Sequence, residues 1–143
     1  MNPIRLDSQG HSLEIALTSI DTDAASPRPG DAHVSVTVQS GGFVGCSQLA
    51  LEASDLQRFC RDLAALDRTL DGEVRLASMS PGALEMRIHA VSSRGLLAVS
   101  GTTGCMMRGD SARFWHAVSF GFEFHAAQLA EALRHSWLRR YAA

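Results

Sequence analysis

Histidine and cysteine are the residue types in this sequence best suited to bind a metal ion or to act in catalysis. The chain has six histidines and three cysteines, but none stand at the C-x-x-C or H-x-x-x-H spacing that marks many zinc sites. His89, His116 and Cys105 lie far apart in the sequence, and only folding could bring them into one pocket. The spacing therefore predicts no metal site.

Nucleophilic catalysis also lacks a recognisable motif. No serine stands in the Gly-x-Ser-x-Gly turn that exposes a hydrolase nucleophile, and no basic residue adjoins Cys46 to activate its thiol. The glycine-rich segment 101–104 lacks the Lys-Ser or Lys-Thr of a phosphate-binding loop, and we expect it to connect two strands. We predict no catalytic residues and no enzyme, with a triad assembled from distant residues as the alternative.

Charge is distributed unevenly along the chain, whose net charge is −2. Residues 1–71 contain five arginines and ten acidic residues, whereas residues 72–143 contain eight arginines and five acidic residues. The acidic first half argues against nucleic-acid binding, which needs clustered basic side chains to neutralise phosphates. An acidic face can instead attract a basic protein. Asp21, Asp23 and Asp31 stand in one loop rich in turn-forming residues, and a solvated surface loop is the alternative interpretation.

Apolar periodicity predicts seven strands and two helices. The clearest helix begins at Ser54, a good N-cap residue, and Gln57 completes a capping box. Gly41-Gly42 predicts a tight turn between two strands. The expected strands cover residues 12–20, 34–38, 43–51, 73–79, 84–89, 96–102 and 113–124, and the expected helices cover 54–70 and the region of Leu129, Leu133 and Trp137.

The last strand has the most regular alternation. Its apolar face should be buried, because side chains at every second position of a strand point the same way. Only Trp115 breaks the pattern. The residues expected on that face are Phe114, His116, Val118, Phe120, Phe122 and Phe124.

Short turns between successive strands favour antiparallel pairing. The order β-β-β-α-β-β-β-β-α therefore predicts an α+β fold of two layers, with a mostly antiparallel sheet of about six to seven strands and two helices packed on one face. Length and composition indicate a single domain, residues 1–143. No apolar run is long enough to span a membrane, and the first residues lack a secretory signal, so we expect a cytoplasmic protein.

Two parts of the sequence carry a family resemblance. The first runs from Gly41-Gly42-Phe43-Val44-Gly45 through Leu49–Leu51 to Ser54-Asp55-Leu56 and Phe59, and the second joins Phe120-Gly-Phe122-Glu-Phe124 to a helix containing Leu129. This pattern resembles the WapI-type immunity proteins, small bacterial proteins that protect a cell from polymorphic or contact-dependent toxins. The resemblance covers about residues 11–141. The chain departs from it at His125-Ala126-Ala127, where the family often has Asp-Gln followed by Ser or Thr.

The resemblance implies a protein that inhibits a cognate toxin domain by binding it, with no catalysis and no cofactor. It assigns no binding residue, because the family's toxin contacts do not form a fixed motif. If the toxin is basic, we expect the three loop aspartates to contact it. One alternative is a homodimer joined through an exposed sheet edge. Another is a small enzyme or ligand-binding domain whose pocket lies between sheet and helices, near His89, His116 and Cys105.

Overall fold

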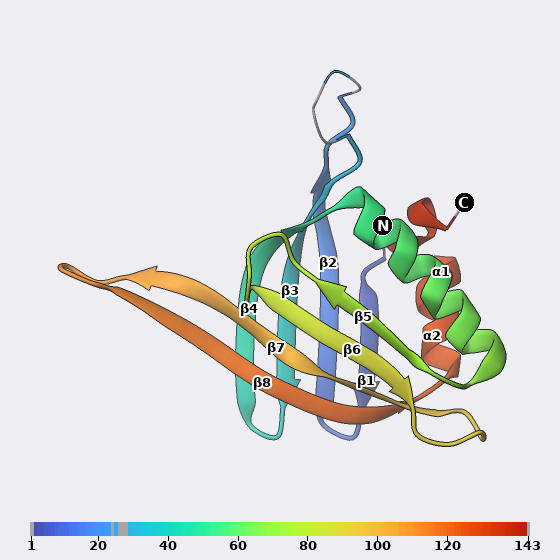
Figure 1. The fold of residues 1–143 in the computed structure, drawn as a ribbon. Coiled ribbons are helices and arrows are strands. Elements are labelled where there is room, and N and C mark those ends of the chain that lie inside the picture. The colour runs from blue at the N-terminus through green and yellow to red at the C-terminus, as the bar shows by residue number, and fades with distance from the viewer. Residues whose placement is uncertain (1, 24, 26–28, 143) are drawn as a thin grey trace.

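The computed structural model describes residues 2–23, 25 and 29–142. Within these residues the chain forms eight strands, two α-helices and one 3₁₀ helix (Figure 1). In chain order the elements are β1 (Ile4–Ser8), β2 (His11–Ile20), β3 (Ala32–Ser40), β4 (Phe43–Leu51), α1 (Ala53–Thr69), β5 (Glu73–Ala77), β6 (Leu84–Ala90), β7 (Leu96–Arg108), β8 (Arg113–His125), α2 (Ala127–His135) and η1 (Trp137–Tyr141).

The strands form two antiparallel sheets, in the orders β1-β2-β3-β4 and β5-β6-β7-β8. The α+β class is confirmed, but the expectation of one sheet with six to seven strands is wrong. Helix α1 separates the two sheets in sequence, and in each sheet every strand pairs only with its sequence neighbours. Alternation in the sequence shows that each strand has a buried face, but both one sheet under helices and two facing sheets satisfy that pattern.

Strand β1 is absent from the sequence prediction. Ile4 and Leu6 are buried and pair with Ile15 and Leu13 of β2. The connecting residues Gln9 and Gly10 both have positive φ, 45° and 86°, as a two-residue type I′ hairpin requires. The expected turn at Gly41-Gly42 has the same form, with φ of 59° and 93°.

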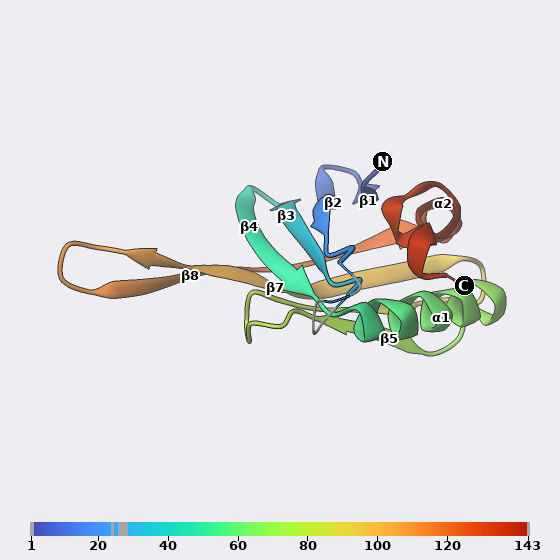
Figure 2. The ribbon, with the colours of Figure 1, turned by 90° about the horizontal axis from the view of Figure 1, so that it is seen from above.

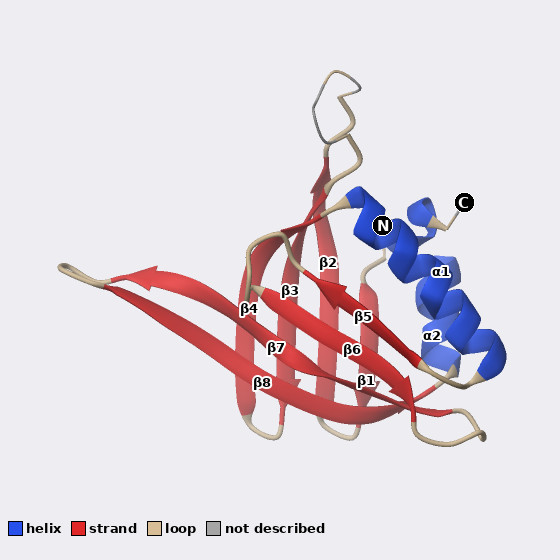
Figure 3. Cartoon of the chain, in the orientation of Figure 1, coloured by secondary structure: helices blue, strands red, loops and turns tan. Residues whose placement is uncertain are grey.

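The two sheets face each other across the core and cross at a steep angle (Figures 1 and 2). The facing strands supply alternating apolar side chains, as the sequence predicted for the strands around Val36 and Phe122. Helices α1 and α2 lie at one flank, where α1 contacts β5 and α2 contacts β1 (Figure 3). They therefore close the side of the structure at the edge strands β1 and β5, rather than cover one face of a single sheet.

The helix ends differ from the sequence prediction. Helix α1 starts at Ala53, and its N-cap residue Glu52 makes no side-chain capping bond, so the predicted cap at Ser54 is wrong. The helix ends at Thr69, and Leu70 takes a left-handed conformation with φ 52°. Helix α2 is shorter than the spacing of Leu129, Leu133 and Trp137 suggested, because the chain turns at Ser136 into η1.

Strand β7 is longer than predicted. It continues through the segment 101–104, which we had expected to be a connection, and pairs with β8 from Leu96↔His125 to Arg108↔Arg113. Its other neighbour, β6, pairs with it only as far as Leu84↔Thr103. The end of the β7–β8 hairpin is therefore a two-stranded ribbon that extends away from the rest of the molecule (Figures 1 and 2).

Candidate functional site

Large apolar side chains are exposed at the projecting end of the β7–β8 hairpin. We call residues 104–117 the hairpin arm, because they lie beyond the last pair between β6 and β7. Four of its apolar side chains are about half exposed, and two at the β3–β4 turn are exposed still further. Several large exposed apolar side chains in one part of a protein usually mark an interaction site. These six residues are Met106, Met107, Phe114, Trp115, Phe43 and Val44.

The register of the hairpin places these side chains on both faces of the arm. Met107 pairs with Phe114 on the face that continues the buried side of β8. Met106 pairs with Trp115 on the opposite face. Each of these four side chains is about half exposed, so both faces of the arm are accessible to a partner. The prediction that Phe114 and His116 belong to a buried face is wrong, since Phe114 is 55% exposed and His116 is exposed as well.

Glycines hold the aromatic rings of the arm in place. A Cβ atom at Gly104 would lie 2.6 Å from Cζ2 of Trp115, and one at Gly82 would lie 3.2 Å from the same atom. A Cβ atom at Gly109 would lie 2.9 Å from Cε2 of Phe114. The rings therefore pack directly on glycine backbone, although each is about half exposed. Packing of this kind fixes the rings before a partner arrives, which lowers the entropic cost of binding.

Gly104→Ala should displace the Trp115 ring without removing apolar surface. The added methyl group would also lie 2.9 Å from the carbonyl oxygen of His116, so we expect a loss of about 1–3 kcal/mol in unfolding free energy. Gly121→Ala is the matched control on β8, because its Cβ would meet its nearest neighbour, on Ser100, at 3.5 Å. Urea unfolding followed by circular dichroism measures both, and equal stability of the two variants would contradict the packing argument.

The base of the arm contains the pocket nearest to the one expected from the sequence. Cys105 and His116 are cross-strand partners and line a cavity of about 380 Å³ together with Met107, next to the contact between Gly45 and Val118. His89, the third residue expected at this pocket, lies elsewhere, on β6 between β5 and β7. Its Nδ1 is buried without a hydrogen-bond partner among the described residues. The pocket expected between sheet and helices therefore does not bring these three residues together.

The cysteines do not assemble a metal or redox site. Cys46 lies on the outer side of β4, where Thr37 donates a hydrogen bond to its Sγ at 3.7 Å. Cys60 is buried in α1, donates to the carbonyl of Leu138 at 3.3 Å, and burial raises its thiol pKa to about 12. It is one of the buried residues of this helix. No group of three or more His, Cys, Asp or Glu residues in the described chain could hold a metal ion.

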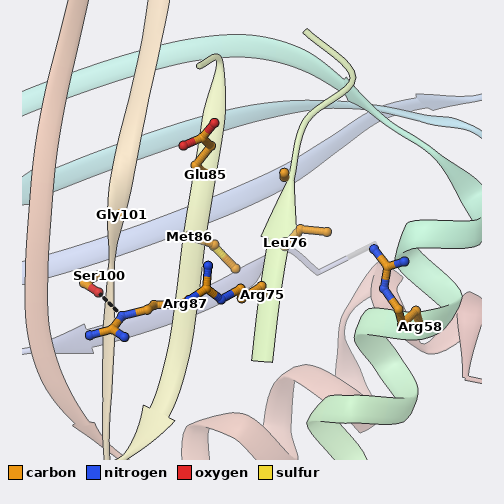
Figure 4. Close-up of a pocket in the computed structure, with 9 residues that line it drawn as sticks. Arg58, Arg75, Leu76, Glu85, Met86, Arg87, Ser100 and Gly101 are labelled. Carbon is orange, nitrogen blue, oxygen red and sulfur yellow. Dashed lines mark hydrogen bonds between the residues drawn. The ribbon is translucent and has the colours of Figure 1, made fainter. Parts of the chain in front are cut away.

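A second hollow, of about 550 Å³, lies on the outer side of β5, β6 and β7 (Figure 4). Arg58, Arg75 and Arg87 line it, and such a cluster suggests an anion site. However, Arg58 pairs with Asp55, and both Arg75 and Arg87 pair with Glu73. The hydrogen bond from Arg75 is the main cause of a lowered pKa of the Glu73 carboxyl, and Arg87 lowers this pKa further. The guanidinium groups are thus occupied by the protein's own carboxylates, which argues against an anion-binding role.

The three aspartates named from the sequence have different environments. Asp23 is exposed and Asp21 is partly buried, and the main chain of Asp21 bonds to Asp31 and Gly30 across the loop. Asp31 itself is only 8% exposed. Its Oδ1 accepts a hydrogen bond from the backbone N of Ala53 at 2.9 Å, so it caps the start of α1 from a distant part of the chain. A partner-binding role for the three aspartates stays a prediction.

Asp31→Ala should destabilise the fold by about 1 kcal/mol, because the first turn of α1 loses its side-chain acceptor. Asp31→Asn is the control, since it removes the charge but keeps an oxygen that can accept from Ala53. Thermal unfolding of the two variants distinguishes capping from charge. If both variants unfold with the wild type, capping by Asp31 contributes nothing measurable.

Comparison with known proteins complements this geometry. Within the described residues, no helix has the length and apolar character needed to cross a membrane. No curated protein and no solved structure matches the chain. The family model of the immunity protein WapI-like family matches residues 4–136, which include both sheets and helix α2. The chain therefore belongs to the WapI-like immunity protein family.

Proposed function

We propose that this chain is a bacterial immunity protein that neutralises a cognate toxin domain in the cytoplasm by binding it directly, through the hairpin arm and without catalysis. The observation that carries the proposal is the exposure of Met106, Met107, Phe114 and Trp115 on a projecting ribbon. A folded chain gains no stability by exposing such side chains to water. Membership of an immunity protein family supplies the class of partner.

The composition of the arm suits a protein partner. Tryptophan, phenylalanine and methionine are enriched at the centre of protein interfaces, where a few buried anchors supply most of the binding energy. The arm can enter a concave surface of the toxin, because β7 and β8 continue as a pair beyond the last pair between β6 and β7 and project from the molecule (Figure 1). Inhibition would then follow from blocking the toxin's active cleft or from excluding its substrate.

Coexpression with the toxin domain encoded next to this chain's gene tests the proposal. The wild-type chain should restore growth and should form an equimolar complex in size-exclusion chromatography with light scattering. Protection should disappear once toxin exceeds immunity protein, because a binder acts stoichiometrically. Full protection at a small fraction of the toxin concentration would contradict the proposal and favour an enzyme, and absence of a complex would contradict it as well.

The loop aspartates offer a second proposed contact, at a separate part of the surface. The exposed carboxylate of Asp23, with Asp21 beside it, would attract a basic toxin domain and accelerate association. Reversing both charges should slow association and reduce its dependence on salt, as stopped-flow binding would show. An unchanged association rate would remove this contact and leave the hairpin arm as the proposed site.

A further inference from the structure

The tip of the hairpin arm carries two arginines that the rest of the protein does not neutralise. Arg108 and Arg113 are cross-strand partners that close the hairpin, so their side chains leave the same face of the ribbon. Both are exposed, and within the described residues neither makes an ion pair, although Asp110 lies in the turn between them. Like charges placed directly opposite each other destabilise a hairpin. Fold stability therefore does not account for this pair.

The other arginines on strands behave differently. Arg5 on β1 bonds to Asp7 and to Glu14, at 3.0 and 2.9 Å. On β5 and β6, both arginines bond to one glutamate, as described above. The arginines of α2 and η1 lie in the last turns of their helices, where the helix dipole favours positive charge. Among the strand arginines of the described chain, the two at the arm tip are thus the ones without a carboxylate.

The same face of the arm contains apolar side chains next to this charge. Met106 and Trp115 form the cross-strand pair two residues before the arginine pair, so they share its face. The face therefore alternates between an apolar pair and a cationic pair. Guanidinium groups bind carboxylates through two parallel hydrogen bonds, and tryptophan, methionine and arginine are the residue types enriched at protein interfaces.

We propose that this face of the hairpin arm binds an acidic patch with an apolar centre on the partner protein. Arg108 and Arg113 pair with carboxylates of that patch, and Trp115 packs against its apolar centre. The proposal rests on the proposed function and specifies the chemistry of the toxin surface. It places a basic contact on this chain, even though the chain as a whole is acidic.

Nucleic acid is the other macromolecule that arginine and tryptophan could bind, by phosphate contacts and base stacking. The arm fits it less well. Nucleic-acid binding requires many basic groups along a path, whereas this tip has two arginines and a net-negative chain behind it. One side of the Trp115 ring is already covered by Gly104, and the methionines around it form no hydrogen bonds with bases. An acidic protein surface satisfies both the apolar and the charged pairs.

Calorimetric titration of the chain with the purified, catalytically inactivated toxin domain tests the proposal, at low and at high salt. Arg108→Glu combined with Arg113→Glu should weaken binding about 100-fold at low salt, and affinity should then rise, rather than fall, as salt is added. Arg139→Glu combined with Arg140→Glu makes the same change of charge on η1, at the opposite end of the molecule from the arm (Figure 1). This control should bind within about 3-fold of the wild type. Circular dichroism verifies that both variants fold.

The outcomes separate this proposal from the proposed function. Wild-type affinity and salt dependence in the arm variant would overturn the proposal, and the proposed function would stand if the toxin still bound. Equal losses in both variants would also overturn it, because the effect would then depend on net charge alone. Binding of a fluorescent single-stranded RNA by the wild type, lost in the arm variant, would replace the acidic protein by nucleic acid. No complex between wild type and toxin would reject the proposed function itself.

Discussion

Replacing Phe114 and Trp115 together with alanine is expected to weaken binding of the toxin domain by about 100-fold or more. The two rings lie on opposite faces of the hairpin arm and are 55% and 47% exposed, so each can enter the partner while the other contacts its rim. Burial of a large aromatic side chain at the centre of an interface commonly contributes about 2 kcal/mol or more. Calorimetric titration with the inactivated toxin domain measures the loss, and growth in coexpression shows whether protection follows it.

The fold should tolerate this double replacement. The rings pack on Gly104, Gly82 and Gly109 and are about half exposed, so we expect the melting temperature to fall by less than about 4 °C. Val91→Ala with Leu96→Ala is the matched control, because it removes exposed apolar surface from the residue after β6 and from the first residue of β7 instead. Equal binding by wild type and the arm variant would exclude the arm as the site. Equal losses in the arm variant and the control would indicate nonspecific adhesion.

The alternation of apolar residues predicted most strands because it follows directly from backbone geometry. Val34, Val36 and Val38 alternate along the strand expected at residues 34–38, and each is at most 1% exposed. The same rule gave a wrong result for Phe114. Period 2 defines which side chains share a face, but a neighbouring layer must cover that face before it is buried. Strand β8 extends beyond β6 and beyond the facing sheet, so the alternation continues where the cover has ended.

The hairpin arm was missed because the segment 101–104 was interpreted as a connection. Two features of the sequence could have revealed it. The expected strand 113–124 is longer than its expected partner 96–102. The connection between them, residues 103–112, is also too long, since hairpin loops are usually two to five residues long. Trp115 also breaks an otherwise regular alternation, which places a large apolar ring on the face that was expected to be polar. Extending the partner strand to Arg108 would have explained both observations.

Long-range hydrogen bonds account for the remaining differences. The sequence near α1 contains a good local cap at Ser54, but the structure uses the carboxylate of Asp31. That carboxylate lies 22 residues earlier in the chain. A capping box is a local pattern, and a distant side chain that supplies the same hydrogen bond leaves no periodic trace. The position of Trp137 is a second case, because it depends on a contact with β2 that no spacing within the helix indicates.

Replacing Trp137 with alanine is expected to destabilise the protein by about 3–5 kcal/mol, the largest effect on folding that we predict. Trp137 is fully buried, and its Nε1 donates to the backbone carbonyl of Ile15 at 2.8 Å. Its ring packs edge-on against Tyr141, with centroids 6.1 Å apart. The replacement leaves a cavity and removes a hydrogen-bond donor where η1 contacts the sheet β1–β4. The C-terminal segment should therefore detach first. Urea unfolding followed by circular dichroism measures the change.

Trp137→Phe separates the hydrogen bond from the volume. It keeps most of the apolar ring but removes the indole donor, so we expect a loss of about 1–3 kcal/mol. Trp115→Phe is the control, because its ring is half exposed and forms no hydrogen bond among the described residues. Stability equal to the wild type in Trp137→Phe would contradict a structural role for the bond to Ile15.

The chain has two tryptophans, so Trp137→Phe leaves Trp115 as the only indole emitter. If the arm enters the toxin, that emission must shift to shorter wavelength when the complex forms, because water then leaves the Trp115 ring.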